Sequence, residues 1–335
     1  MLEYYAVAGV AQLVEQLIRN QQVTGSSPVT SSNGSILVMR MLLFIFNQLE
    51  IYMDLCNISV IKEVMSEAGI TFRKEFGQNF LINRMIPENI ADNAAYDKET
   101  LIIEIGPGIG CLTKELAERY KRVVAVEIDK GLIPVLSKTL ADYDNVTVIS
   151  GDIMKTDISE IVNKYSGGMP VAVCANLPYY ITTPILMYLL ESGVKLSSIT
   201  VMVQNEVAAR LVAPAGSSDY GAITAVLGFY GEARKLFKVS AGSFMPAPKV
   251  DSAVVKIDLF SEPKYFPKDE RFFRNLIKAA FEMRRKTLVN AINAKFPHIE
   301  KGRIAEALVS LGFSETVRGE KLSTENFVEL SDLLI

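Results

Sequence analysis

Leu101-Ile-Ile-Glu-Ile-Gly-Pro-Gly-Ile-Gly-Cys-Leu-Thr113 is the stretch that decides the fold. Its opening run of apolar residues, with a single acid, is typical of a strand that is buried on both faces of a parallel sheet. Gly106, Gly108 and Gly110 follow at once, and the apolar spacing after them predicts a helix over residues 112–122. Because glycine lets the backbone approach a ligand closely, this order of strand, glycine turn and helix predicts a nucleotide-type binding site.

Strands and helices alternate along the chain beyond this stretch. Apolar runs predict further strands over residues 122–128, 145–149, 171–176, 199–203 and 252–259. Such alternation predicts a doubly wound α/β domain, in which ligands bind at the carboxyl ends of the strands. Four candidate ligand residues stand at such ends: Gly106, Glu127, Asp152 and Asn176. We therefore expect one binding site at one edge of the sheet.

Two acids follow the strands after the glycine turn. Glu127 lies about twenty residues after the glycines, where a carboxylate can accept hydrogen bonds from both hydroxyls of a ribose. This spacing also suits a dinucleotide, so it does not choose the ligand. Asp152 can accept from an adenine amino group while Ile153 packs on the base, or it can simply cap the next helix.

The next candidate is Asn176-Leu-Pro-Tyr179, which follows the strand over residues 171–176. Pro178 ends the strand because proline has no N–H to donate. The Asn176 amide oxygen and the carbonyl of Leu177 or Pro178 can accept hydrogen bonds from an NH2 group, and Tyr179 offers a face for stacking. The pattern predicts a clamp for a planar base with an exocyclic amine. The alternative is a strand-ending turn with a core tyrosine.

A proline-rich segment over residues 239–252 lies between the last predicted strands. Pro246 and Pro248 restrict the residues before them to extended conformations. Phe244 would then form a second ring opposite Tyr179, so that a flipped base is held between the two rings. The alternative is a crossover connection with a core phenylalanine.

The composition limits the classes of function. The chain has 335 residues, of which 49% are hydrophobic, and a formal net charge of −3, so nucleic-acid binding must be argued from local charge. Cys56, Cys111 and Cys174 contain no CxxC pair, which favours buried thiols in a reducing compartment over disulfides or zinc ligands. His298 is the only histidine and lies in a predicted turn between helices, which disfavours a histidine-based triad, and no metal site is expected.

A charge asymmetry marks the C-terminal part. Residues 261–267 look like a domain boundary, and residues 264–303 contain eleven Lys or Arg and four Asp or Glu, a net charge of +7. Helical apolar spacing and the cationic cluster Arg284-Arg-Lys286 predict a small all-helical domain that binds RNA phosphates. The alternative is a solvated basic face.

Residues 1–52 differ from the rest of the chain. The apolar run over residues 41–46 is too short to span a bilayer, and no signal-peptide pattern accompanies it, so no membrane association is expected. Residues 8–16 and 25–29 are peptides that the D-arm and T-arm of a tRNA gene would encode if translated. We therefore expect a non-native or disordered extension with the native start at Met53, or else at Met41 or Met1.

Seven motifs together resemble the KsgA-type small-subunit rRNA adenine dimethyltransferases over residues 55–335. They are Gln78-Asn-Phe-Leu81, Glu104-Ile-Gly-Pro-Gly-Ile-Gly110, Val126-Glu-Ile-Asp129, Gly151-Asp152, Asn176-Leu-Pro-Tyr179, Phe244-Met-Pro-Ala-Pro-Lys-Val-Asp-Ser252 and Arg284-Arg-Lys-Thr-Leu288. The resemblance implies a class I S-adenosylmethionine-dependent methyltransferase domain over 53–262 and a helical rRNA-binding domain over 263–335. It also implies a cytoplasmic monomer that dimethylates two adjacent adenosines in the 3′-terminal hairpin loop of 16S rRNA, within the 30S subunit or its precursor.

The resemblance and the residue patterns together assign the site residues. The expected cofactor residues are Asn79, Leu81, Gly106, Gly108, Glu127, Asp152, Ile153 and Asn176. The expected catalytic residues are Asn176, Leu177, Pro178, Tyr179 and Phe244. The expected RNA-binding residues are Arg284, Arg285, Lys286 and Lys249.

Two other functions remain open from the sequence. An Erm-type 23S rRNA methyltransferase shares the motif set, although Leu177 and the segment Arg284–Leu288 favour the small-subunit type. A non-catalytic ribosome-assembly factor could use the same scaffold, although the intact strand-end residues disfavour it. An NAD dehydrogenase is disfavoured because the glycine turn lacks glycine at its sixth place and no histidine proton relay is available.

Overall fold

The structure is a computed structural model that describes residues 54–70 and 79–335, all within one compact unit, Met53–Ile335. The predictions for residues 1–52, for the start of the chain and for Gln78 lie outside the described residues. The boundary predicted between residues 262 and 263 stays a prediction.

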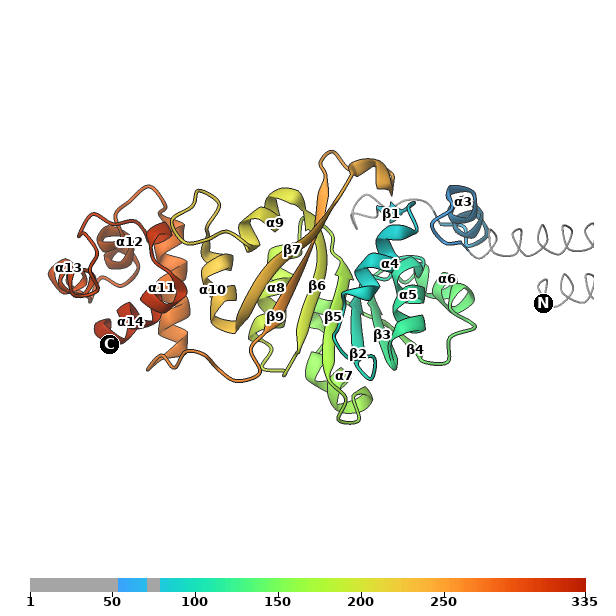
Figure 1. Ribbon diagram of the computed structural model, residues 1–335, viewed down its shortest axis with the longest axis horizontal. Helices are drawn as coiled ribbons and strands as arrows, with labels where there is room; N and C mark the ends of the chain where they lie inside the picture. The colour runs from blue at the N-terminus through green and yellow to red at the C-terminus, as the bar shows by residue number, and fades with distance from the viewer. Residues whose placement is uncertain (1–53, 71–78) are drawn as a thin grey trace, which may run out of the picture. The chain divides into compact units, whose positions relative to one another are not determined.

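A seven-stranded sheet forms the centre of this unit (Figure 1). Its order is β4-β3-β2-β5-β6-β9-β7, in which the first five strands are parallel and β9 is antiparallel to both of its neighbours. The bounds are β2 Leu101–Ile105, β3 Arg122–Glu127, β4 Val146–Ser150, β5 Val171–Asn176, β6 Ser198–Gln204, β7 Gly231–Val239 and β9 Ser252–Leu259. The predicted doubly wound α/β fold is confirmed.

Helices cover both faces of the sheet because alternate residues of each buried strand point to opposite faces. Ile102 and Cys174 belong to the core under α4 and α5, whereas Ile103 and Val173 belong to the core under α7 and α8. The bounds of the elements around the sheet are α3 Ile58–Glu67, α4 Met85–Asp92, α5 Cys111–Arg119, α6 Leu132–Thr139, η2 Ile153–Lys155, α7 Ile158–Tyr165, α8 Thr182–Glu191, α9 Asn205–Leu211, α10 Ala222–Tyr230 and η3 Ala241–Ser243.

The parallel register brings the predicted strand ends together. Glu127, the last residue of β3, pairs with Ser150 of β4, and Ile105 of β2 pairs with Ala175 of β5. Because all four strands run in the same direction, the residues that follow them emerge at one edge of the sheet. A short antiparallel pair, β1 Phe80–Leu81 and β8 Phe244–Met245, completes the local framework.

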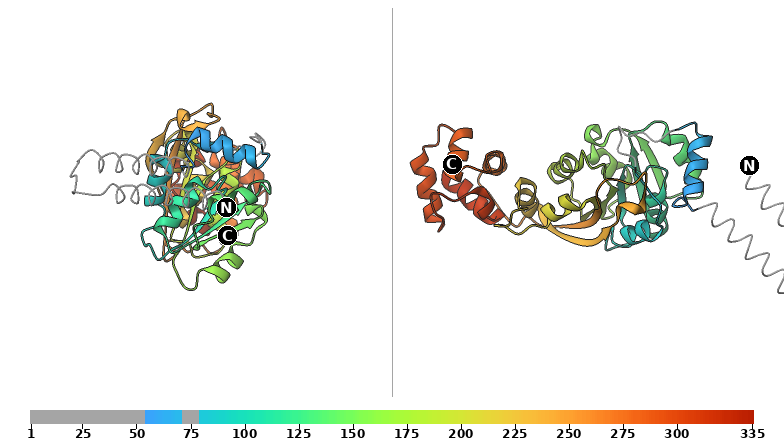
Figure 2. Two further views of the ribbon diagram at one scale, coloured as in Figure 1. Left: turned by 90° about the vertical axis from the view of Figure 1, so that its right-hand side faces the viewer. Right: turned by 90° about the horizontal axis from the view of Figure 1, so that it is seen from above.

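The C-terminal helices form a bundle with its own apolar core (Figures 1 and 2). Phe273, Leu276 and Ile277 of α11 pack with Phe327 of α14, and Val226 of α10 belongs to the same cluster. The bounds are α11 Glu270–Glu282, α12 Leu288–Lys295, α13 Lys301–Ser310, η4 Gly319–Lys321 and α14 Thr324–Leu334. The α10 helix therefore contributes to the cores of both the sheet domain and the bundle.

The edge strand β7 is absent from the sequence-based prediction. Its residues are mostly polar or half-exposed, because an edge strand pairs on one side only and needs no continuous apolar run. The backbone nevertheless requires Gly231 at its start, since a Cβ there would lie 2.3 Å from the Asp258 carbonyl oxygen.

Candidate active site

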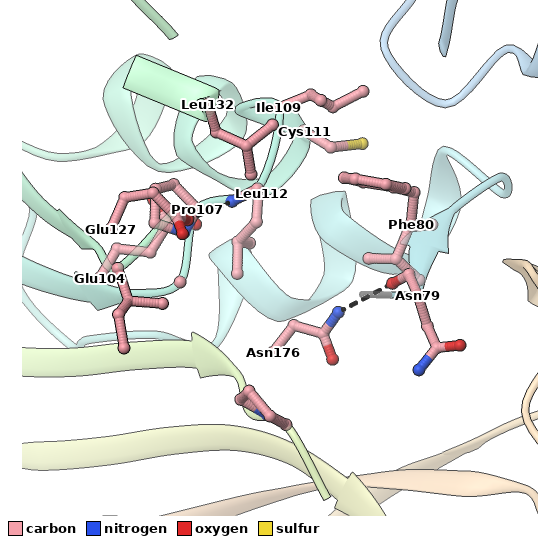
Figure 3. Close-up of a pocket in the computed structure, with 15 residues that line it drawn as sticks. Asn79, Phe80, Glu104, Pro107, Ile109, Cys111, Leu112, Glu127, Leu132 and Asn176 are labelled. Atoms are coloured by element: carbon pink, nitrogen blue, oxygen red, sulfur yellow. Dashed lines mark hydrogen bonds between the residues drawn. The ribbon is translucent and has the colours of Figure 1, made fainter. Parts of the chain in front are cut away.

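A pocket opens at the carboxyl edge of the sheet (Figure 3). The residues that line it come from β1, β2, β3 and β5 and from the segments next to these strands. They are Asn79, Phe80, Leu81, Glu104, Gly106, Pro107, Gly108, Ile109, Cys111, Leu112, Glu127, Ile128, Leu132, Asn176 and Pro178. Seven predicted site residues are thus brought together: Asn79, Leu81, Gly106, Gly108, Glu127, Asn176 and Pro178.

The glycine turn contributes Gly106 and Gly108 to the pocket lining, and Gly110 precedes α5. Gly106, Gly108 and Gly110 all have positive φ values, of 69°, 62° and 97°, which side chains strongly disfavour. A Cβ on Gly108 would also lie 3.2 Å from Cε1 of Phe80. The turn therefore needs glycine both for its backbone conformation and for the space in front of the Phe80 ring.

Glu127 is held rigidly at the end of β3. Its side chain is buried, and its two carboxylate oxygens accept hydrogen bonds from the amides of Gly108, at 3.2 Å, and Asp129, at 2.8 Å. Burial raises the pKa of Glu127, whereas these two backbone hydrogen bonds lower it. Each oxygen retains a second lone pair, so the carboxylate can still accept hydrogen bonds from a diol.

Glu104 is a pocket residue that the sequence patterns did not single out. It is 1% exposed, and its Oε2 atom has no hydrogen-bond partner among the described residues. Burial raises the pKa of the Glu104 carboxyl to about 8, so the group is largely protonated at neutral pH. A single acid inside the apolar run of β2 was the signal that could have identified it.

Asn176 ends β5 and points into the pocket (Figure 3). Its Nδ2 atom donates to the backbone carbonyl of Asn79 at 3.4 Å, and this contact fixes which end of the amide is the acceptor. The Oδ1 atom is then left as a hydrogen-bond acceptor. Asn79 therefore positions Asn176, and the amide presents an oxygen to a bound group.

In the turn after Asn176, the carbonyls of Leu177 and Pro178 differ in whether they already accept hydrogen bonds. The Pro178 carbonyl accepts from the Ile181 amide at 3.2 Å and from the Thr182 hydroxyl at 3.1 Å, which uses both of its lone pairs. The Leu177 carbonyl accepts no hydrogen bond from the described residues. Leu177, rather than Pro178, thus has a carbonyl available to a ligand.

Tyr179 and Phe244 differ in exposure. Tyr179 is half-buried, and its hydroxyl lies 2.6 Å from Oγ of Ser252, which fixes the ring. Phe244 is 3% exposed in the core beside Leu81, and it does not line the pocket. The predicted sandwich of two rings is therefore not formed in this conformation, because the Phe244 ring fills the core.

Asp152 and Ile153 lie at the adjacent strand end but outside the pocket lining. Asp152 caps η2, since its Oδ1 atom accepts from the Met154 amide at 3.0 Å, as the alternative interpretation proposed. Its other oxygen lies 3.7 Å from Nζ of Lys155. The capping bond leaves Asp152 able to accept further hydrogen bonds, so capping and binding are compatible.

Cys111 places a thiol in the pocket wall. Its Sγ atom lies 2.7 Å from Sγ of Cys56, which precedes α3. This hydrogen bond, together with burial, raises the pKa of the Cys111 thiol well above its ordinary value. The thiol is therefore protonated at neutral pH and unsuited to nucleophilic attack.

The basic cluster at the end of α11 contains residues of two kinds. Arg284 donates to the carbonyls of Ser218, at 2.9 Å, and Tyr220, at 3.1 Å, and so ties α11 to the segment before α10. Arg285 and Lys286 are exposed and form no ion pair with the described part of the chain. Lys249 is also exposed and has no such partner within residues 54–70 and 79–335.

The described residues contain neither a cluster of metal ligands nor a membrane-spanning helix. No group of three or more His, Cys, Asp or Glu side chains in residues 54–70 and 79–335 could hold a metal ion. Within the same ranges, every helix is too short or too polar to cross a membrane.

The fold and the pocket together define a class, the methyltransferases built on a Rossmann-like sheet. A dimethyladenosine transferase from Plasmodium falciparum has a similar structure, with a TM-score of 0.63, 28% identity and coverage of 75% of this chain and 95% of that one. The 23S rRNA methyltransferase ErmE is also similar, with a TM-score of 0.60, 25% identity and coverage of 76% and 99%.

Within this class, the chain belongs to the ribosomal RNA adenine dimethylase family, whose profile matches residues 69–335. A relative from Lachnoclostridium phytofermentans, named Ribosomal RNA small subunit methyltransferase A, is 47% identical over 81% of this chain and 94% of its own length. A protein of the same name from Streptococcus pneumoniae is 45% identical over 84% and 98%. The family predicted from the seven motifs is confirmed.

Proposed function

We propose that this protein transfers methyl groups from S-adenosylmethionine to N6 of two adjacent adenosines in the 3′-terminal hairpin loop of 16S rRNA. Each adenosine receives two methyl groups. The observation that carries the proposal is the orientation of Asn176, which lines the pocket and whose amide oxygen is held as an acceptor. An acceptor fixed in this way suits an amine and not a carbonyl or a phosphate.

Membership of a methyltransferase family with this fold implies S-adenosylmethionine as the cofactor. Two observations indicate that the pocket fits this cofactor. The glycines of the turn carry no side chains that would obstruct a ligand, and Oε2 of Glu104 is buried without a hydrogen-bond partner among the described residues. In our proposal the glycines admit the methionine portion, Glu127 accepts from the ribose and Asp152 accepts from the adenine amine. Glu104 offers its carboxylate to the ammonium group. The cofactor supplies a methyl group that its positive sulfur already activates.

The protein's own task is then to prepare the adenine amine. The N6 lone pair is conjugated with the ring, so it must be freed before it can attack. In the first transfer, hydrogen bonds from the two N6–H groups to Oδ1 of Asn176 and to the Leu177 carbonyl would favour a pyramidal nitrogen, while Tyr179 stacks on the base. In the second transfer, the single remaining N6–H donates to one of these two acceptors. In each transfer the new C–N bond forms as the S–CH3 bond breaks, and N6 then loses one proton to solvent. This is catalysis by positioning and electrostatics, and it needs no histidine base.

The choice of rRNA rests on sequence and not on fold. ErmE, a 23S rRNA methyltransferase, has nearly the same TM-score as the dimethyladenosine transferase. The relatives at 45–47% identity, by contrast, are named for the small subunit. We therefore favour 16S rRNA within the 30S subunit or its precursor, with the enzyme acting as a cytoplasmic monomer.

Methyl transfer to purified particles tests this choice. Undermethylated 30S subunits should accept about four labelled methyl groups per particle, whereas 50S subunits should accept none. Mapping the modified nucleotides should give two adjacent dimethyladenosines near the 3′ end of 16S rRNA. Transfer to 50S instead supports the Erm-type alternative, and binding to 30S without any transfer supports a non-catalytic assembly factor.

The basic cluster gives a second test with a matched control. Replacing both Arg285 and Lys286 by Ala should weaken 30S binding and reduce the slope of log K against log salt by roughly 1.5, because two phosphate contacts are lost. The melting temperature should not change, since neither side chain has a partner in the described chain. Arg284→Ala should instead lower the melting temperature, because Arg284 holds the Ser218 and Tyr220 carbonyls. An unchanged salt slope in the double variant contradicts the phosphate contacts.

A further inference from the structure

Two tyrosines occupy the corner of the turn that follows β5. The hydrogen bond from the Ile181 amide to the Pro178 carbonyl, at 3.2 Å, closes a four-residue turn whose central residues are Tyr179 and Tyr180. The Thr182 hydroxyl binds the same carbonyl at 3.1 Å. Tyr180 is therefore attached to a turn whose backbone is fixed beside the Asn176 amide and the free Leu177 carbonyl.

The Tyr180 side chain has no internal role. It is 64% exposed, and it makes no hydrogen bond, ring contact or cation contact with the described part of the chain. Tyr179, its neighbour, is instead fixed by Ser252 and half-buried. A large aromatic ring exposed beside the pocket is available to stack on a planar base.

The other exposed tyrosine and phenylalanine side chains of residues 54–70 and 79–335 are placed differently. Tyr96 is 73% exposed, but its hydroxyl binds Asp258 and Arg234, and Lys256 lies 3.6 Å from its ring centroid. Phe266, at 77% exposed, lies in the connection between β9 and α11. Tyr180 is thus the exposed ring that stands at the carboxyl edge of the sheet with both faces unused.

The proposed substrate requires such a ring. When one of two adjacent adenosines leaves its stack to enter the pocket, its neighbour loses a stacking partner. An aromatic side chain replaces that partner without regard to sequence, because every base has a π-face. We infer that Tyr180 is the stacking platform for the adenosine next to the one being methylated.

This inference rests on the proposed function, and it gives a physical reason why two adjacent adenosines are both methylated. The platform holds one adenosine while the other reacts, and it can then hold the modified base during the second reaction. Lys249, which lies three residues before the Ser252 that anchors Tyr179, can contact a phosphate of the same dinucleotide. Tyr180 is therefore a residue that binds the substrate and links methylation of the first adenosine to methylation of the second. Asn176, by contrast, accepts a hydrogen bond from the amine that is methylated.

Steady-state methylation of undermethylated 30S subunits tests the platform. Wild type, Tyr180→Ala and Tyr180→Phe are compared, with Leu333→Ala as an exposed control on α14. Stacking on one base changes an equilibrium constant by roughly 5- to 150-fold. We expect Tyr180→Ala to raise the KM for 30S about tenfold and to accumulate particles with one dimethylated adenosine. Tyr180→Phe and Leu333→Ala should match wild type, and all variants should keep the wild-type Kd for S-adenosylmethionine and the wild-type melting temperature.

The alternative outcomes are distinct. A KM for 30S that is unchanged in Tyr180→Ala overturns the platform while the proposed function stands. A loss in Tyr180→Phe equal to that in Tyr180→Ala assigns the effect to the hydroxyl and also overturns it. A fall in kcat alone, equal at both adenosines, shows that Tyr180 positions the reacting base instead. A wild-type protein that methylates no 30S particle contradicts the proposed function itself.

Discussion

Asn176→Ala should lower kcat for 30S methylation by about 10²- to 10³-fold, while the Kd for S-adenosylmethionine changes by about threefold or less. The magnitude is that of losing one preorganised polar group at a reacting centre, about 2.7–4 kcal/mol. The physical reason is that Oδ1 of Asn176 is held as an acceptor by the bond from Nδ2 to the Asn79 carbonyl. Without this acceptor, the amine keeps its lone pair in conjugation with the ring.

Separate measurements of the two constants check this expectation. Single-turnover methyl transfer gives the rate of the chemical step, and calorimetry gives the affinity for the cofactor. Asn293→Ala is a suitable control, because this asparagine donates to the Ile299 carbonyl in the helical bundle, away from the pocket. A variant at Asn176 with a normal rate and a weakened affinity for the cofactor would refute the catalytic role.

Glu104→Gln should stabilise the cofactor-free protein at alkaline pH. The carboxyl has a pKa of about 8 in the folded protein against an ordinary value of 4.5, because burial disfavours the charged form. Between these values the folded protein holds a proton that the unfolded chain releases, so stability is lost as pH rises from about 4.5 to about 8. At about 1.4 kcal/mol per pKa unit, the destabilisation above pH 8 amounts to a few kcal/mol.

Thermal unfolding at pH 5.5 and pH 9 measures this effect. The melting temperature of Glu104→Gln should exceed that of wild type by more at pH 9 than at pH 5.5, because only wild type carries the buried charge. A difference that does not depend on pH would show that the carboxyl does not titrate in this range. Glu99, an exposed acid that forms an ion pair with Lys121, provides a control substitution, Glu99→Gln.

The same group links cofactor binding to protons. If Glu104 pairs with the ammonium group, binding at pH 7 must release the proton that the free carboxyl holds. Calorimetry in two buffers of different ionisation enthalpy should then show a release approaching one proton in wild type. Glu104→Gln should bind the cofactor more weakly and release fewer protons. Equal release from both proteins contradicts the pairing.

Local sequence patterns predicted the parts of the fold that local physics controls. Buried parallel strands need continuous apolar runs, so β2, β3 and β5 were evident from their composition. The edge strand β7 was missed because it pairs on one side and tolerates charge. Glu104 was also missed. An acid inside an apolar run can be recognised as a candidate site residue only when its burial and its lack of a hydrogen-bond partner among the described residues are known.

The sequence by itself determined that Gly106, Glu127 and Asn176 share one edge, because residues that follow parallel strands must emerge on the same side of the sheet. Only the tertiary structure decided which atoms are available there. Asn79 lies 97 residues before Asn176 and orients the Asn176 amide through a hydrogen bond. The Thr182 hydroxyl donates to the Pro178 carbonyl, so the Leu177 carbonyl is the one that remains available to a ligand. A motif specifies residue types and backbone direction. A hydrogen bond to a carbonyl that is distant in sequence depends instead on the tertiary packing that brings the two residues together.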